Sequence, residues 1–554
     1  MSVHASFNNQ ADFLFVNYQD DNPQNRSNSL SRQKAVFAQK AHQRKKRIAA
    51  VERLKTSKPA FCQKLPFVYD AAPPVYSTLP YREENTKEAD STSEAAREDV
   101  LPPHLAILKA RQMKDLWSPL SHLGQGFIDP FYTAAVPMSE FMNLYWHHFR
   151  QFIIPLAYPL NSSPMGAWWW QQGLSEPVIH QTLLISAASH RLAMDTVNNA
   201  PLHNLQRSKR EFLRIQGDII KRLNRLLQHP DTISESITLT IAALRAIEAI
   251  SCNYDCVAVH TEGLNALIQL HGGIEKLDHQ TLWEIYQSDI MYAALTDTVP
   301  VRPLITRWRS EILQEADIIY SGDDFVSQLD LKPKVAARLS ILGTSFFNAS
   351  WYTSLSDTMK TLLHVSQRLI QYYEKGQIQP STVLPTDNSL FLVLGHGLLS
   401  VRYPAAQDED ADKTSCALDE PIRITLFIYL NMRIWNFQEY PIMQLLVNRL
   451  QASLLRTTSP TSPAPALAQI KNTAPDLLFW ILFTGGMAAQ GHDVHLWFVH
   501  QLVDLAPFLG LREWEMVRVV LGGFFYTDQP DQPRGEALWE QVVLTGLDGL
   551  LSTI

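Results

Sequence analysis

The chain has 554 residues and a mass of 62.9 kDa, which allows roughly three or four domains of about 150 residues or one large helical body. Hydrophobic residues make up 46% of the sequence and charged residues 19%, and this composition excludes a chain that is disordered throughout. The four cysteines and the absence of an apolar leader predict an intracellular protein without a disulfide framework. The most apolar run, residues 476–490, is shorter than the ~20 residues that cross a bilayer, so we expect no membrane partner.

The N-terminal part is predicted to consist of a docking peptide with a basic segment, residues 1–58, and a disordered linker, residues 59–100. The alternating run Phe13-Leu14-Phe15-Val16 is typical of a short strand or a docking peptide. Residues 29–55 contain neither Gly nor Pro, so they favour a helix, which Pro59 ends. The linker contains five prolines and then an acidic run rich in Ser and Thr.

A strongly basic segment is attached to an otherwise acidic chain. From Arg26 to Lys58 there are eleven Lys and Arg and one Glu, a net charge of +10 within a chain of net charge −7. The run Arg44–Arg47 resembles the compact cationic clusters that nuclear import receptors bind, and the neighbouring charges suit the phosphates of nucleic acid. The residues predicted for import or nucleic-acid contact are Arg32, Lys34, Lys40, Arg44, Lys45, Lys46, Arg47 and Arg53.

Two alternatives apply to this segment. A solvated helix face also explains a short run of Lys and Arg. A basic leucine zipper does not fit, because Pro59 and Pro66 end the helix before a second apolar heptad forms.

Residues 101–554 show helical periodicity almost to the end, and alternating strand patterns are nearly absent. The predicted fold class is all-α: a large multi-helix array of antiparallel helices, preceded by a disordered or partly helical basic head. Thr232 and Glu235 form a capping-box pattern, Gly272–Gly273 follow a helix end, and loops are expected at 376–388, 407–413 and 457–475. The predicted helices are 139–154, 176–196, 205–228, 233–252, 256–270, 280–296, 334–347, 358–373, 390–401, 420–437, 441–455, 475–489, 495–505, 513–523 and 538–550.

The sequence contains no nucleophile elbow, phosphate-binding loop or zinc-protease helix, so no enzyme, catalytic residue, cofactor or metal is predicted. The nearest arrangement to a metal site is His492, Asp493, His495 and His500. On a helix with 100° per residue, His500 lies about 140° from His495, which favours ordinary helix-end histidines.

Other residues that suggest chemistry also have a simpler interpretation. Cys252 and Cys256 are four residues apart, but no second Cys or His pair lies nearby to complete a tetrahedral site, so buried thiols are expected. His147–His148 and Trp168–Trp170 suggest a proton relay or a ligand cage. Packing beside amphipathic helices is the preferred interpretation of both runs.

Five phrases of the helical part occur in a characteristic order. They are FRQFIIP at 149–155, WWWQQGLSEPVIHQTLLISAASH at 168–190, VAVHTEGLNALIQLHGGIEKL at 257–277, LDEPIRITLFIYL at 418–430 and LLFWILFTGGMAA at 477–489. Together they resemble the fungal-specific transcription factor domain, the helical regulatory region of many fungal zinc-cluster activators. In the third phrase His260, Gly263, Leu264 and Gly272–Gly273 match the family's pattern, and His271 stands where an Arg is usual.

The resemblance covers roughly residues 139–525, and the head at 13–47 is similar to that of family members without a zinc cluster. A Zn2Cys6 cluster needs six cysteines within about thirty residues. The first 100 residues contain only one cysteine, Cys62, so the family's usual DNA reader cannot form.

The resemblance implies a nuclear transcriptional regulator that controls a metabolic gene set, with a secondary-metabolite gene cluster as the expected example. Its implied partners are DNA, through the basic head, and other transcriptional proteins. The alternative is a helical interaction or scaffold protein that does not bind DNA, such as a co-regulator. A helical enzyme is a third class, which would require ionisable residues that converge on a substrate-sized pocket.

Overall fold

The computed structural model describes residues 140–229, 233–315, 331–379, 385–401, 418–459, 462–527 and 534–552. The basic segment with its eight candidate residues, the predicted linker, the acidic loop 407–413 and Thr232 lie outside these residues. Within them the regular structure is helical, and the predicted all-α fold is confirmed. The exception is a two-stranded antiparallel hairpin of β1 (Thr457–Ser459) and β2 (Ser462–Pro465).

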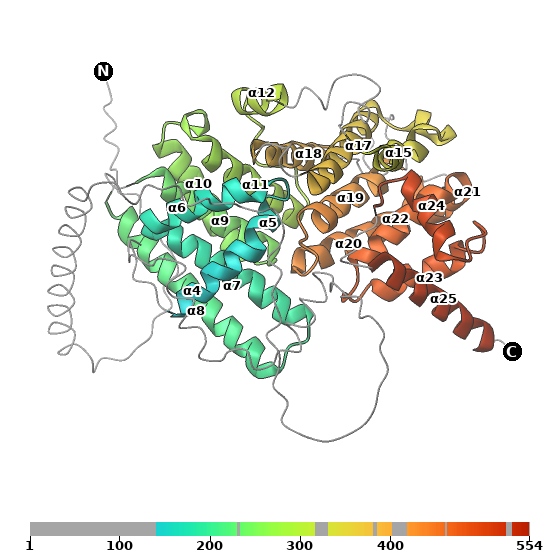
Figure 1. Ribbon diagram of the computed structural model, residues 1–554, viewed down its shortest axis with the longest axis horizontal. Coiled ribbons are helices and arrows are strands. Elements are labelled where there is room, and N and C mark those ends of the chain that lie inside the picture. The colour runs from blue at the N-terminus through green and yellow to red at the C-terminus, as the bar shows by residue number, and fades with distance from the viewer. Residues whose placement is uncertain are drawn as a thin grey trace, which may run out of the picture. The chain divides into compact units, whose positions relative to one another are not determined.

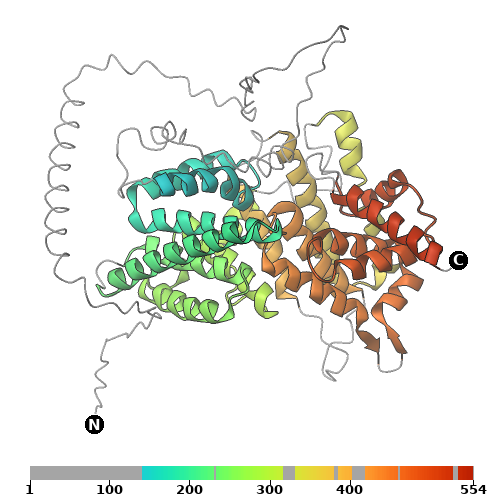
Figure 2. The same cartoon turned by 90° about the horizontal axis from the view of Figure 1, so that it is seen from below.

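The N-terminal group of helices packs around α9 and α11, as Figure 1 shows. Helix α9 contacts α7, α10 and α11, and α7 also packs on α4, α6 and α8. Seen from below, the blue-green helices stack over the green ones (Figure 2). The elements are α4 (Glu140–His148), η3 (Phe149–Ile153), α5 (Ile154–Ala157), α6 (Ser162–Ser175), α7 (Pro177–Val197), α8 (Leu202–Leu227), α9 (Glu235–Ile250), α10 (Tyr254–Leu270), η5 (Ile274–Lys276), α11 (His279–Thr296) and α12 (Thr306–Glu315).

The C-terminal group packs around α22, whose residues from Leu477 to Ala488 are all buried. This helix contacts α19, α20, α21, α23, α24 and α25. Gly485 allows the ring of Phe498 to pack directly against the backbone of α22, since a Cβ at this position would lie 2.5 Å from that ring. The elements are α15 (Pro333–Ser340), α16 (Thr344–Phe347), η6 (Ser350–Ser354), α17 (Asp357–Ile378), η8 (Pro385–Asn388), α18 (Ser389–Ser400), α19 (Asp419–Tyr429), η9 (Leu430–Ile434), α20 (Pro441–Leu455), α21 (Ala466–Thr473), α22 (Pro475–Ala488), α23 (His495–Leu505), α24 (Trp514–Gly523) and α25 (Arg534–Ser552).

None of the helices in the described part of the chain combines the length and the apolar character that a bilayer crossing requires.

Three predicted helices are interrupted. The helix expected at 334–347 breaks at Gly343, whose φ is +80° and whose N–H donates to the carbonyl of Phe524 over 3.0 Å. Those expected at 139–154 and 420–437 contain the π-helical turns η3 and η9. Pro155 lacks an N–H and its ring displaces the carbonyl four residues earlier, so the chain widens to a π turn there.

The sequence analysis missed three helices, α6, α12 and α21. The prediction of a loop throughout 457–475 was wrong, because the hairpin and α21 occupy most of that stretch. The predicted helix end at Gly272–Gly273 is confirmed: both have positive φ, and the N–H of Gly273 donates to the carbonyl of Ile268 over 2.9 Å. Glu235 accepts from the backbone N–H of Asp278 over 3.1 Å and so joins α9 to the start of α11.

A buried ion cluster joins α9 to α11. Arg245 on α9 and Asp289 on α11 are both fully buried, and Arg245 Nη1 lies 2.5 Å from Asp289 Oδ1. Arg302, in the segment after α11, lies 2.6 Å from the same oxygen. Arg245 also donates to the hydroxyls of Ser288 and Thr261, over 3.1 and 2.8 Å. These bonds offset part of the cost of burying the charges, while Arg245 Nη2 and Asp289 Oδ2 have no hydrogen-bond partner among the described residues.

Asp289→Ala is expected to lower the free energy of unfolding by about 3–5 kcal/mol, because it leaves the buried guanidinium of Arg245 without its counter-ion. Urea denaturation measures this. The matched control is Glu515→Ala, which removes an exposed ion pair with Arg518 and should change stability by less than about 0.5 kcal/mol. Similar losses in both variants would contradict a special role for the buried cluster.

Candidate functional site

A cavity lies inside the N-terminal group of helices and reaches the segment before α20. Its walls come from η3, α5, α6, α7, α9, α11 and the residues Phe437 and Tyr440, and its volume is about 110 Å³. One water molecule needs roughly 10–15 Å³, and a cavity of about 150 Å³ holds a benzene ring. The space therefore suits several waters or one compact organic molecule.

Small residues on α9 explain why the space is not filled. Ala243 and Ala246 face the cavity, while large aromatic side chains such as Trp169 and Trp283 stand around it. Rigid rings cannot bend into the volume that the two alanine methyl groups leave empty.

The π turn η3 shapes another wall. The N–H of Ile154 donates to the carbonyl of Phe149, five residues earlier. This wider turn brings Phe149, Ile153 and Ile154 to the same side of the chain, and all three line the cavity. Single π turns within helices are frequent at functional sites.

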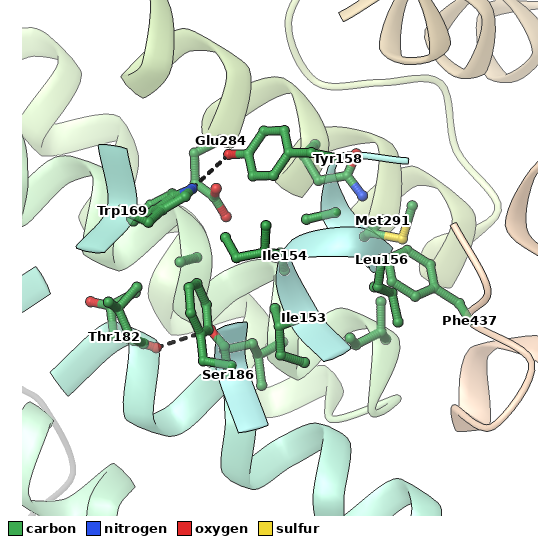
Figure 3. A pocket seen from close by; sticks show the side chains of 18 of the residues that line it. Ile153, Ile154, Leu156, Tyr158, Trp169, Thr182, Ser186, Glu284, Met291 and Phe437 are labelled. Atoms are coloured by element: carbon green, nitrogen blue, oxygen red, sulfur yellow. Dashed lines mark hydrogen bonds between the residues drawn. The ribbon is translucent and has the colours of Figure 1, made fainter. Parts of the chain in front are cut away.

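Polar groups gather at one end of the cavity. The hydroxyl of Tyr158 accepts from Trp169 Nε1 over 2.9 Å and from Gln280 Nε2 over 2.6 Å. Its ring stacks on Trp283, with centroids 4.8 Å apart and planes 28° apart. Figure 3 shows Glu284 beside this pair of Tyr158 and Trp169, across the space from Thr182 and Ser186.

Glu284 is the one carboxyl group among the residues that line this cavity. It is 9% exposed, and burial raises the pKa of its carboxyl from 4.5 to about 8, so it holds its proton at neutral pH. No hydrogen bond or ion pair joins its carboxyl to another described residue. One turn further along α11, the Oε1 atom of Gln287 is buried and has no hydrogen-bond partner in the described part of the chain.

Of the tryptophans that sequence analysis singled out, Trp169 lines the cavity. Trp168 and Trp170 pack against aromatic neighbours, Trp168 on Trp169 and Trp170 on Trp146. The packing interpretation of this run was therefore incomplete.

The two histidines that precede the π turn differ. His147 is exposed, and His148 Nε2 lies 2.9 Å from His190 Nδ1. Burial lowers the pKa of His148 to about 3 and that of His190 to about 4, so the contact joins two neutral rings.

The other candidates lie away from the cavity. His495 bonds to the carbonyl of Gly486 and to the side chain of Gln541, and His500 is exposed. Cys252 and Cys256 are half-buried free thiols whose pKa burial raises. In the described ranges, no three His, Cys, Asp or Glu side chains stand close enough together to hold a metal ion.

The sequence analysis did not identify Glu284, Gln287 or Tyr158. A weak signal was present: Glu284 and Gln287 are three residues apart in WEIYQSDIM and therefore share one helix face. A polar pair on a helix face does not reveal from sequence whether it contacts a partner side chain, water or a cavity.

Comparison with protein-family models, with curated proteins and with solved structures finds no match for the chain. Its function is therefore inferred from its own residues.

Glu284→Gln tests whether the raised pKa of the Glu284 carboxyl makes the stability of the folded protein depend on pH. Because the folded protein keeps this proton up to about pH 8 and the unfolded chain loses it near pH 4.5, wild-type stability is full below pH 4.5 and falls as the pH rises towards 8. Gln does not titrate. Between pH 5 and pH 8.5 the difference in unfolding free energy should therefore move in favour of the variant by roughly 3–5 kcal/mol.

Urea denaturation across this pH range measures the difference, with the exposed substitution Glu515→Gln on α24 as the control. The unfolding free energy of the control should change with pH in the same way as that of the wild type. A Glu284→Gln curve parallel to the wild type as well would show that the carboxyl titrates normally.

Proposed function

We propose that the chain is a fungal transcriptional regulator of a metabolic gene set, with a secondary-metabolite cluster as the expected target. In this proposal the basic head supplies nuclear import and contacts to DNA phosphates. The helical body binds a small-molecule effector in its cavity and docks other transcriptional proteins.

One observation supports the effector role most directly. Two of the phrases that resemble the family's regulatory domain, residues 149–155 and 168–190, meet at the cavity and supply much of its wall. A ligand that contacts several separate segments stabilises the conformation in which those segments close around it. Such a ligand can therefore change the surface that the body offers to partners.

The head supports the nuclear part of the proposal. Its net charge of +10 provides the counter-charge for several phosphates, and Arg44–Arg47 fits the import signal.

Two exposed apolar ridges favour the second candidate function, a co-regulator that reaches promoters through another protein. Met516 and Val519 lie three residues apart on α24 and are 43% and 77% exposed. Leu544 and Leu547 have the same spacing on α25 and are 63% and 51% exposed. Apolar side chains that gather on a helix surface are typical of docking sites.

Replacement of Arg44–Arg47 by alanine in a fluorescent fusion should shift the protein from the nucleus to the cytoplasm, because import receptors need the compact positive charge. Microscopy gives the readout. The matched control replaces Lys209, Arg210, Lys221 and Arg225, which are exposed on α8, and should stay nuclear. Nuclear accumulation of the head variant would remove the import role, and a cytoplasmic wild type would exclude both nuclear functions.

Genome-wide chromatin occupancy separates the two candidate functions. Deletion of residues 1–58, with an unrelated nuclear import signal added, should abolish occupancy if the head contacts DNA. Occupancy that survives the deletion would assign recruitment to the helical body and favour the co-regulator.

A further inference from the structure

Two polar side chains at one end of the cavity lack a hydrogen-bond partner among the described residues. Gln287 Oε1 is a buried acceptor without a donor among the described residues. The carboxyl of Glu284 makes no hydrogen bond or ion pair there, and burial alone accounts for its raised pKa. The hydroxyl oxygen of Tyr158 already accepts two bonds. Buried polar atoms are almost always satisfied, so a ligand with several N–H bonds would complete the hydrogen bonding of Gln287 and Glu284.

The positions of Glu284 and Gln287 on α11 also indicate that one ligand can contact both side chains. Glu284 and Gln287 are one turn apart on α11, and residues three apart on a helix share a face. Both line the same cavity, so one ligand head group can reach both side chains.

A basic nitrogen fits this end better than a hydroxyl. A buried carboxyl ionises readily only when a cation takes the place of the lost water, and the resulting charge-assisted bond is about twice as strong as a neutral one. Trp169, Trp283 and Tyr158 stand beside the carboxyl, and aromatic faces attract cations. A hydroxyl group offers one donor, whereas a primary ammonium offers three.

We propose that the cavity binds a compact, apolar primary amine, about the size of one small ring, whose ammonium group pairs with Glu284 and donates to Gln287 Oε1. The inference rests on the proposed role of the cavity as an effector site and adds the chemical class of the effector. It does not depend on DNA binding.

Among the described residues that line the cavity there is no Lys, Arg, His or Asp, and Glu284 is the one Glu. The titratable groups there are Glu284 from α11, Tyr158 from the segment after α5 and Tyr440 from the segment before α20. Burial raises the pKa of both tyrosines, so both are neutral across the range in which Glu284 titrates. Glu284 is therefore the group that controls how amine binding depends on pH.

Isothermal titration of the full chain with cyclopentylamine and cyclopentanol tests the proposal, since the two probes differ only in their polar group. For six heavy atoms we expect a Kd of about 0.1–1 mM for the amine and at least tenfold weaker binding of the alcohol. At pH 6.5 the amine should release about one proton per molecule bound, because the carboxyl must ionise. Its affinity should rise roughly tenfold from pH 6 to pH 7. The alcohol should release none.

Three variants locate the effect. Glu284→Gln should weaken the amine at least tenfold and change the alcohol by less than threefold. Glu248→Gln is the matched control, because Glu248 is a buried carboxyl on α9 that bonds to Asn253 and does not line the cavity. Ala246→Leu fills the space and should abolish binding of both probes. If Glu284→Gln does not fold, two measurements still test the proposal. Proton release by the wild type shows that a carboxyl ionises on binding, and Ala246→Leu shows whether the amine binds in the cavity.

Equal affinity for the two probes, or amine binding without proton release, would overturn the amine class and leave the cavity as an effector site. Amine binding that survives both Glu284→Gln and Ala246→Leu would place the amine elsewhere on the chain and overturn the inference. Failure of both probes to bind would count against the amine class and against the proposed effector role.

Discussion

The carboxylate of Asp289, held between Arg245 and Arg302, is the interaction on which the N-terminal group of helices depends. Residues 237–250 of α9 are all buried, and α11 is nearly as enclosed. A helix that is buried on all sides has no solvent-exposed face to fix its rotation about its axis. The ion pair provides this constraint, because Arg245 and Asp289 can meet in only one rotation of each helix. Buried polar pairs of this kind specify register at some cost in stability.

The same constraint determines the chemistry of the cavity. Both helices supply cavity walls on other faces than those that hold the ions, so fixing α9 against α11 also fixes Ala246 relative to Glu284. The burial of the Glu284 carboxyl depends on this packing. Its raised pKa is therefore a property of the assembled helices, and the chain maintains it at the expense of stability at neutral pH.

Much of the helix content could be predicted from sequence because it depends on local periodicity. Helices α7, α10, α11, α20 and α23 begin and end within two residues of the predicted bounds. Helix α6 was missed because its run of tryptophans, with Pro164 and two glycines, hides the apolar stripe, and α21 was missed because prolines surround it. The cavity could not be predicted, since its empty volume depends on how several segments far apart in the sequence meet. Gln287 looks like any polar helix residue until its neighbours are placed.

The complete burial of α22 constrains how the protein is made. Residues 477–488 are synthesised before α23, α24 and α25, which cover much of their surface. On the ribosome this apolar helix is therefore without a large part of its shell until about sixty further residues have emerged. Chains that end early would expose it permanently. A chain truncated before α25 therefore presents the kind of apolar surface that chaperones and proteases recognise.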